Sequence, residues 1–124
     1  MKLIIAGSRS IKLDPEFMDS IILHFDFIEE LKELVSGGAK GVDSAGENWV
    51  YFYNNKNKNE IKLKVIKPNY DKYGRYDAPK IRNEKMAKYA DELLLIWDGK
   101  SGGSYHMKQC MIYLKKPVHQ IVIK

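Results

Sequence analysis

Two glycine-rich segments have the composition of loops that bind phosphate. Residues 37–43 read Gly-Gly-Ala-Lys-Gly-Val-Asp, and residues 98–104 read Asp-Gly-Lys-Ser-Gly-Gly-Ser. A glycine loop that leads into a helix exposes backbone N–H groups and the positive end of the helix dipole, which favour an anion. Neither segment has the spacing of a dinucleotide-binding loop or a P-loop. Each alone could be a tight turn, but the two together favour a ligand that carries phosphate.

Arginine is scarce among the basic residues. Of 21 lysines and arginines, only Arg9, Arg75 and Arg82 are arginines, and all three lie in or beside segments marked by glycine and proline. The planar guanidinium binds phosphate through two parallel hydrogen bonds, which a lysine cannot do. We therefore expect Arg9 to bind phosphate or ribose, and Arg82 with its neighbour Asn83 to cover the ligand.

Two acidic residues suggest acid–base chemistry. Asp43 and Glu47 are four residues apart on a predicted helix, and a carboxylate pair at this spacing can transfer protons. Exposed acids are common on helices, so we interpret Glu47 as a solvated side chain. Asp43 either favours the helix dipole or faces the ligand. If the chain is an enzyme, Asp43 and Asp98 are the candidate catalytic groups.

Other reactive side chains give weaker signals. Ser8, His106 and Asp98 contain the groups of a hydrolase triad, but no nucleophile elbow accompanies them. Cys110 lies on an apolar helix stripe, which indicates inert packing. Three tyrosines within residues 69–77 either stack on a base or pack over the end of the sheet.

Strands and helices alternate along the chain. Apolar runs and period-two alternation predict five strands at residues 3–6, 33–36, 61–67, 93–97 and 118–123. Helical spacing and caps predict helices at residues 14–31, 42–53, 78–90 and 107–114. The connections are predicted loops, including a polar loop at residues 54–60, a long connection at residues 68–77 and a glycine turn at residues 99–104.

This alternation predicts the fold class. Right-handed crossovers give a three-layer, Rossmann-like, doubly wound sheet of about five parallel strands in the order 3-2-1-4-5, as a single domain over residues 1–124. Strands 1 and 4 are then neighbours whose connections leave in opposite directions. Ligands of open α/β sheets bind in the crevice at such a point. We expect the segments Gly7-Ser8-Arg9, Ser36-Gly37-Gly38 and 98–104 to converge there.

Composition limits the alternatives. The chain has 124 residues, is 44% hydrophobic and contains no apolar run near the ~20 residues of a membrane span. The apolar start fits a first strand better than a leader, so we expect a cytoplasmic protein without membrane partners. One cysteine and three scattered histidines predict no internal disulfide, no metal site and no cofactor. The net charge of +5 fits a phosphorylated ligand or nucleic acid.

The order of these motifs resembles the SLOG superfamily, and most closely its YspA/YpsA-related branch (the DUF2493 group), found in bacteria and often in phages. The resemblance covers nearly the whole chain and is carried by Ile5-Ala6-Gly7-Ser8-Arg9, by residues 36–43, by Ile81-Arg82-Asn83 with Met86, by Ala90-Asp91 and by residues 97–104. It implies a Rossmann-like fold, a pocket for nucleotides or nucleotide-derived signals, and homo-oligomers. Helix faces with Phe25, Phe27 or Tyr51 could supply the contacts between subunits.

Three functions follow from this resemblance. The leading expectation is binding of a nucleotide-derived signal, such as an ADP-ribose-type or cyclic nucleotide, which a phage could use to sequester a defence messenger. The alternatives are an N-glycosidic hydrolase of the Lonely Guy type and a single-stranded nucleic-acid binder like the DNA-processing protein A branch. Lonely Guy enzymes use a glutamate where this sequence has Met107, which favours binding over catalysis.

The predicted ligand-binding residues combine the glycine loops with the polar side chains beside them. They are Gly7, Ser8, Arg9, Ser36, Gly37, Gly38, Asp43, Arg82, Asn83, Asp98, Gly99, Ser101, Gly102, Gly103 and Ser104.

Overall fold

Two apolar strands form the centre of the fold, which a computed structural model describes for residues 1–58 and 60–124. β1 (Lys2–Gly7) and β4 (Glu92–Trp97) pair in parallel, with Leu3 opposite Glu92 and Gly7 opposite Ile96. Most of their side chains are buried on both faces, as in parallel strands covered by helices on both sides.

The remaining strands complete one five-stranded parallel sheet. β2 (Glu33–Ser36) pairs with β1, β3 (Lys62–Val65) forms one edge, and β5 (Val118–Val122) forms the other. The sheet order is β3-β2-β1-β4-β5, which confirms the predicted 3-2-1-4-5 order. The alternation predicted for the third strand is also confirmed, because Lys62 and Lys64 are exposed and Leu63 and Val65 are half-buried.

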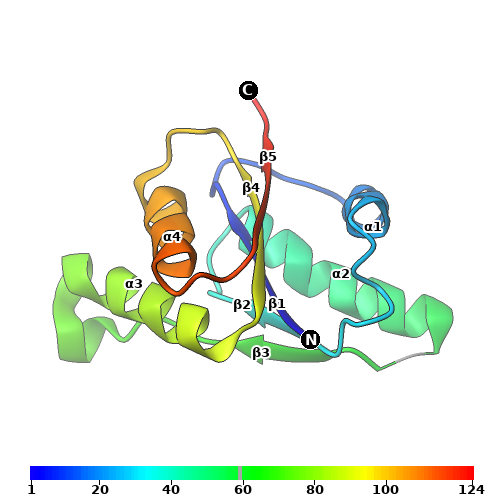
Figure 1. Ribbon diagram of the computed structural model, residues 1–124, viewed down its shortest axis with the longest axis horizontal. Coiled ribbons are helices and arrows are strands. Elements are labelled where there is room, and N and C mark those ends of the chain that lie inside the picture. The colour runs from blue at the N-terminus through cyan, green and yellow to red at the C-terminus, as the bar shows by residue number, and fades with distance from the viewer. Residues whose placement is uncertain (59) are drawn as a thin grey trace.

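Helices cover both faces of this sheet, so the fold is the predicted three-layer, Rossmann-like arrangement. α1 (Pro15–His24) and α2 (Val42–Asn57) cover one face, and α3 (Tyr70–Tyr89) and α4 (Gly102–Tyr113) cover the other (Figure 1). Each face has its own apolar core. Trp49 lies in the core under α1 and α2, and Trp97 in the core under α3 and α4.

The first helix is shorter than predicted. Asp14 caps it by accepting a 2.8 Å hydrogen bond from the Phe17 N–H, as expected, but the helix ends at His24 and not near Leu31. Asp26 has a φ of 59°, in the left-handed region, which stops the helix. The apolar pattern extends past the end of the helix because Phe27 and Leu31, in the irregular turn that follows, are also buried. Phe27 is therefore core, and not a subunit contact as predicted.

Two predicted loops are helical. Residues 68–77 were expected to form a connection, but α3 begins at Tyr70, where the Asn69 side chain accepts a 3.1 Å hydrogen bond from the Lys72 N–H. Gly74, with a φ of 83°, kinks this helix before the segment that was predicted. In the predicted loop 54–60, α2 continues to Asn57, and residue 59 lies outside the described residues.

Within residues 1–58 and 60–124, no helix combines the length and the apolar character needed to cross a membrane.

Candidate functional site

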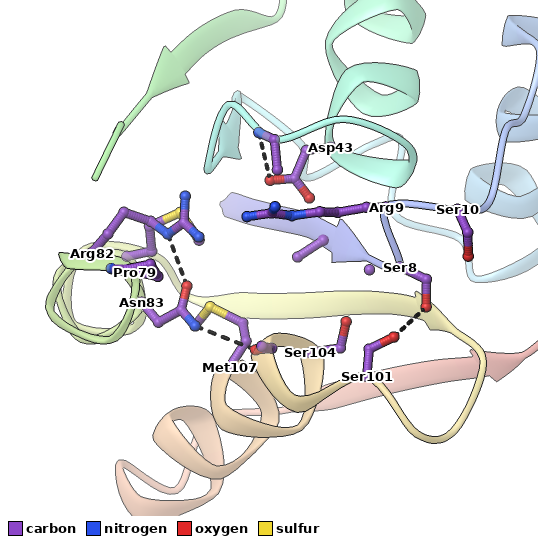
Figure 2. Close-up of a pocket in the computed structure, with 15 residues that line it drawn as sticks. Ser8, Arg9, Ser10, Asp43, Pro79, Arg82, Asn83, Ser101, Ser104 and Met107 are labelled. Atoms are coloured by element: carbon purple, nitrogen blue, oxygen red, sulfur yellow. Dashed lines mark hydrogen bonds between the residues drawn. The ribbon is translucent and has the colours of Figure 1, made fainter. Parts of the chain in front are cut away.

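A cavity of about 380 Å³ opens at the carboxyl ends of β1 and β4, where the strand order reverses. We call it the switch-point cavity, and Figure 2 shows the residues that surround it. Four elements contribute: the end of β1, the start of α2, the middle of α3 and the first turns of α4. Its lining consists of Ala6, Gly7, Ser8, Arg9, Ser10, Ala39, Asp43, Pro79, Arg82, Asn83, Met86, Ser101, Gly103, Ser104 and Met107.

Gly7 and Ser8 join the two central strands at the cavity floor. A Cβ on Gly7 would lie 1.7 Å from the Ile96 carbonyl oxygen, so only glycine fits this approach of β1 to β4. Ser8 is 1% exposed, and its Oγ accepts a 3.0 Å hydrogen bond from the Asp98 N–H. The same hydroxyl lies 3.0 Å from Ser101 Oγ. Ser8 therefore holds the ends of β1 and β4 together while it lines the cavity.

Asp98 shapes its own loop and does not line the cavity. Its Oδ1 accepts 2.8 Å hydrogen bonds from the N–H groups of Lys100 and Ser101 and from the Ser101 hydroxyl. These donors lower the pKa of the Asp98 carboxyl to about 2. Gly99 and Gly102 also lie outside the lining. Asp98, Gly99 and Gly102 thus lie apart from the cavity. The Asp98 carboxylate, which was a candidate catalytic group, accepts hydrogen bonds from its own loop instead.

The first turn of α4 presents unused hydrogen-bond donors to the cavity. The helix begins at Gly102, earlier than predicted, and its cap residue is Ser101. The Ser101 hydroxyl donates to Asp98, so it makes no capping bond to the helix. Ser104 is 6% exposed, and its hydroxyl has no hydrogen-bond partner among the described residues. It points into the cavity in Figure 2, where an anion would satisfy both this hydroxyl and the helix dipole.

Arg82 is fixed at the opposite wall of the cavity. Its Nη1 donates to the Gly37 carbonyl at 2.5 Å, and its Nε donates to Asn83 Oδ1 at 2.9 Å. Burial lowers the pKa of the Arg82 guanidinium. The charges of Asp43 and Tyr70 act to raise this pKa, and the charge of Arg9 acts to lower it. Figure 2 shows Arg9 extending across the cavity towards Arg82. The guanidinium of half-buried Arg82 thus faces that of exposed Arg9, and an anion between them would stabilise both charges.

Asn83 connects α3 to the start of α4. It is 4% exposed, and its Nδ2 lies 3.3 Å from the Gly103 carbonyl oxygen and 3.2 Å from His106 Nδ1. Asn83 therefore holds the neighbouring loop and also lines the cavity. Since His106 contacts Asn83 and Cys110, it does not complete a triad with Ser8 and Asp98.

Asp43 is the buried carboxylate of the cavity. It is 5% exposed and accepts a 3.3 Å hydrogen bond from the Ala39 N–H. Burial raises the pKa of the Asp43 carboxyl, although the Ala39 hydrogen bond and the charge of Arg82 act in the opposite direction. A carboxylate in this environment is suited to accept hydrogen bonds from ligand hydroxyls, or to exchange a proton.

Glu47 has a structural partner, so its prediction as a solvated side chain was wrong. The Ser36 hydroxyl donates to Glu47 Oε2 at 2.6 Å and accepts a 3.1 Å hydrogen bond from the Gly38 N–H. Ser36 is fully buried and lies outside the cavity lining, although it was predicted to bind ligand. The pair therefore supports the Gly37-Gly38 loop from beneath. The spacing of Glu47 one helical turn after Asp43 is the signal that could have identified it.

A second cavity, of about 620 Å³, adjoins the first beyond the ends of β2 and β3. We call it the lysine cavity; its lining consists of Arg9, Gly37, Gly38, Ala39, Lys40, Lys67, Pro68, Tyr70 and Arg82. It shares Arg9, Ala39 and Arg82 with the switch-point cavity. Of the three tyrosines considered for stacking, Tyr70 lines this cavity, while Tyr73 and Tyr76 line neither cavity.

Sequence reasoning missed several residues of the two linings. Met86 was noted only as part of the motif that follows Ile81-Arg82-Asn83, and Pro79 only as part of a predicted helix. Lys67 was one lysine among many, so no local signal distinguished it. Lys40 was recognisable, because it lies inside the glycine segment 37–43.

Cys110 lies away from both cavities, in a groove of about 270 Å³ between α3 and α4. Burial raises the pKa of its thiol, and its sulfur lies 3.7 Å from His106 Nε2. The thiol therefore stays protonated at neutral pH, as expected of a packing residue.

Comparison of the chain with models of known protein families finds no match, and comparison with curated proteins finds no relative. The resemblance to the SLOG superfamily therefore rests on the sequence motifs and their order.

Proposed function

We propose that this chain binds a nucleotide-derived small molecule in the switch-point cavity, with a phosphate group at the first turn of α4. The observation that carries the proposal is the Ser104 hydroxyl, which has no hydrogen-bond partner among the described residues, faces the cavity and lies in a helical turn without a side-chain cap. Arg9 and Arg82 reach the same space from the other side. Hydroxyl, N–H groups and two guanidinium groups together match the acceptors of a phosphate.

The rest of the lining supports a nucleotide over a simple anion. Asp43 would repel a bare phosphate, but it can accept hydrogen bonds from the hydroxyls of a ribose. Ala6, Met86 and Met107 give the cavity an apolar wall suited to a sugar or base. The volume of about 380 Å³ lies within the range of small-molecule sites, ~300–1,000 Å³.

Family resemblance narrows the ligand class. If the chain is a SLOG protein, the ligand is an ADP-ribose-type or cyclic nucleotide signal, and a chain of this size could sense or sequester it. Met107 lines the cavity at the position where Lonely Guy enzymes have their glutamate. The absence of a carboxylate there supports binding without turnover.

Mass spectrometry of small molecules released by denaturing freshly purified protein tests this proposal. We expect an intact nucleotide derivative, and calorimetric titration with AMP and ADP-ribose then measures the affinity. Arg9→Gln should weaken binding about tenfold or more, since a charge-assisted contact contributes roughly 1.5–3 kcal/mol. Arg75→Gln is the matched control, because Arg75 is an exposed arginine that lines neither cavity. Equal affinities for both variants would reject the proposed site.

A hydrolase that cleaves the N-glycosidic bond is the second candidate. The observation in its favour is Asp43, a buried carboxyl with a raised pKa in the cavity, which is the environment of many general acids and bases. Incubation with nucleoside monophosphates should then release free base, and Asp43→Asn should abolish the release. Recovery of unchanged nucleotide after prolonged incubation with saturating protein would exclude this activity.

A further inference from the structure

Most of the predicted site residues line one or both of two adjoining cavities, and one of these cavities has no assigned ligand group. The lysine cavity has a wall in common with the switch-point cavity, formed by Arg9, Ala39 and Arg82. A molecule that occupies the switch-point cavity can therefore extend past the two arginines into the lysine cavity.

The charges of the lysine cavity all have one sign. Arg9, Lys40, Lys67 and Arg82 line it, and none of its nine lining residues is acidic. The switch-point cavity differs, because Asp43 lies there beside the same two arginines. Asp43 acts as a counter-charge to Arg82 from the neighbouring cavity, whereas Arg9, Lys40 and Lys67 have none in the lining. An anionic group would relieve the repulsion among these cations.

The lysine side chains are available for such a group. Neither Lys40 nor Lys67 makes a hydrogen bond or ion pair with another described residue. The stem of Lys67 lies against the Gly38 backbone, where a Cβ on Gly38 would be 3.2 Å from Lys67 Cγ. Gly38, with a φ of 74°, therefore permits both the turn and the close approach of this lysine to the cavity.

From this charge distribution we infer that the lysine cavity is a second anion subsite, so that the ligand carries a second phosphate or carboxylate beyond the phosphate at α4. This inference rests on the proposed function, since it extends the ligand of the switch-point cavity. Arg9 and Arg82 lie between the two anionic groups and contact both. Tyr70 forms an aromatic side of the subsite, against which a sugar or base can pack.

Calorimetric titration with two nucleotides tests this inference. AMP has one phosphate, whereas adenosine bisphosphate with a phosphate on each side of the ribose has two. We expect the bisphosphate to bind the wild-type chain about tenfold more tightly than AMP, which corresponds to roughly 1.4 kcal/mol. The double variant Lys40→Gln/Lys67→Gln should remove this preference and leave the affinity for AMP nearly unchanged.

A matched control separates the subsite from general charge. Lys85→Gln/Lys88→Gln removes the same charge from exposed positions on α3 that line neither cavity, and it should retain the preference. If both double variants lower the preference equally, or if neither lowers it, the subsite is overturned.

Failure of the proposed function gives a different result. In that case neither nucleotide binds any of the variants, whereas failure of the subsite alone leaves AMP binding intact without a preference for the bisphosphate. Titration with oligothymidylates of increasing length is the third arm. An affinity that rises steadily with length and falls steeply with salt would overturn the small-molecule subsite in favour of single-stranded nucleic acid.

Discussion

A methyl group on Gly37 would enter the space between Arg82, which lines both cavities, and Asp43, which lines the switch-point cavity. An ideal Cβ at this position would lie 2.6 Å from Arg82 Nη1 and 2.9 Å from Asp43 Oδ2. Both distances are too short for a real contact, so Gly37→Ala forces these atoms to move. The backbone of Gly37 does not have a positive φ, and alanine can therefore adopt it. The substitution thus tests the placement of the guanidinium without a change of charge.

The expected effects on stability and on binding differ in size. Restoring van der Waals distance moves Nη1 by about 1 Å and breaks its 2.5 Å hydrogen bond to the Gly37 carbonyl. Because Arg82 is only partly buried, its end can turn towards water, and we expect the free energy of unfolding to fall by about 1–2 kcal/mol. A bound phosphate instead loses a charge-assisted contact of about 1.5–3 kcal/mol, which weakens binding roughly 10- to 100-fold.

Thermal unfolding and calorimetric titration with AMP measure the two effects on one protein sample. Gly102→Ala is the matched control, since a Cβ at Gly102 meets nothing within 4 Å and Gly102 lies outside both cavity linings. It should bind AMP normally and unfold at the same or a slightly higher temperature. Wild-type affinity in a folded Gly37→Ala protein would refute the reasoning, because Arg82 would then not act on the ligand from its observed position.

Three further substitutions have signs that the structure determines. Asp43→Asn should raise the stability at neutral pH. Burial raises the pKa of Asp43 in the folded chain, so its ionised form destabilises the fold once the pH exceeds the pKa of Asp43 in the unfolded chain. The variant should melt a few degrees higher than the wild type and bind AMP more weakly. Asp98→Asn should be less stable than wild type at neutral pH, and the difference should disappear as acid titration passes from about pH 4 to pH 2, since the folded pKa of about 2 lies below the unfolded one. Lys116→Met should lower the free energy of unfolding by about 2 kcal/mol in a urea titration. Lys116 Nζ donates hydrogen bonds to three carbonyls at the end of α3: Ala87 at 2.7 Å, Lys88 at 3.1 Å and Ala90 at 2.7 Å. A wild-type urea midpoint for Lys116→Met would show that these bonds add nothing to stability.

The architecture was predictable from local pattern. Five short apolar or alternating segments, separated by segments with helical spacing, permit few topologies when the crossovers are right-handed. The observed sheet order is the one that was predicted. The errors occurred at helix ends. α1 stopped early because Asp26 turned left-handed, and α3 started early because Asn69 capped an extra turn before Gly74. Such ends depend on hydrogen bonds within single turns, which hydrophobic periodicity does not report.

The site was predictable as a location and less so as a set of side chains. Gly7, Arg9, Asp43, Arg82, Asn83 and Ser104 do line the switch-point cavity, because parallel strands bring their carboxyl ends to one edge. Ser36 and Asp98 do not, although they belong to the same loops. The Ser36 hydroxyl forms hydrogen bonds with Gly38 and Glu47. The Asp98 carboxylate accepts hydrogen bonds from Lys100 and Ser101, so both side chains are held by local partners and do not face the cavity.

The strand order, the two helix faces and the position of the glycine loops could be predicted from the sequence, because they depend on residue type and on spacing along the chain. Two features could be read only from the tertiary structure: which of the two aspartates, Asp43 or Asp98, lines the switch-point cavity, and which lysines line a cavity together with Arg9 and Arg82. Asp43 follows a glycine-rich segment and Asp98 precedes one, but Asp43 is buried in the cavity lining, whereas Asp98 accepts hydrogen bonds from its own loop. Lys67 joins Arg9 and Arg82 only because β3 ends beside β2 in space. Side-chain direction depends on packing and on hydrogen-bond competition between distant segments, and neither is encoded in a local pattern.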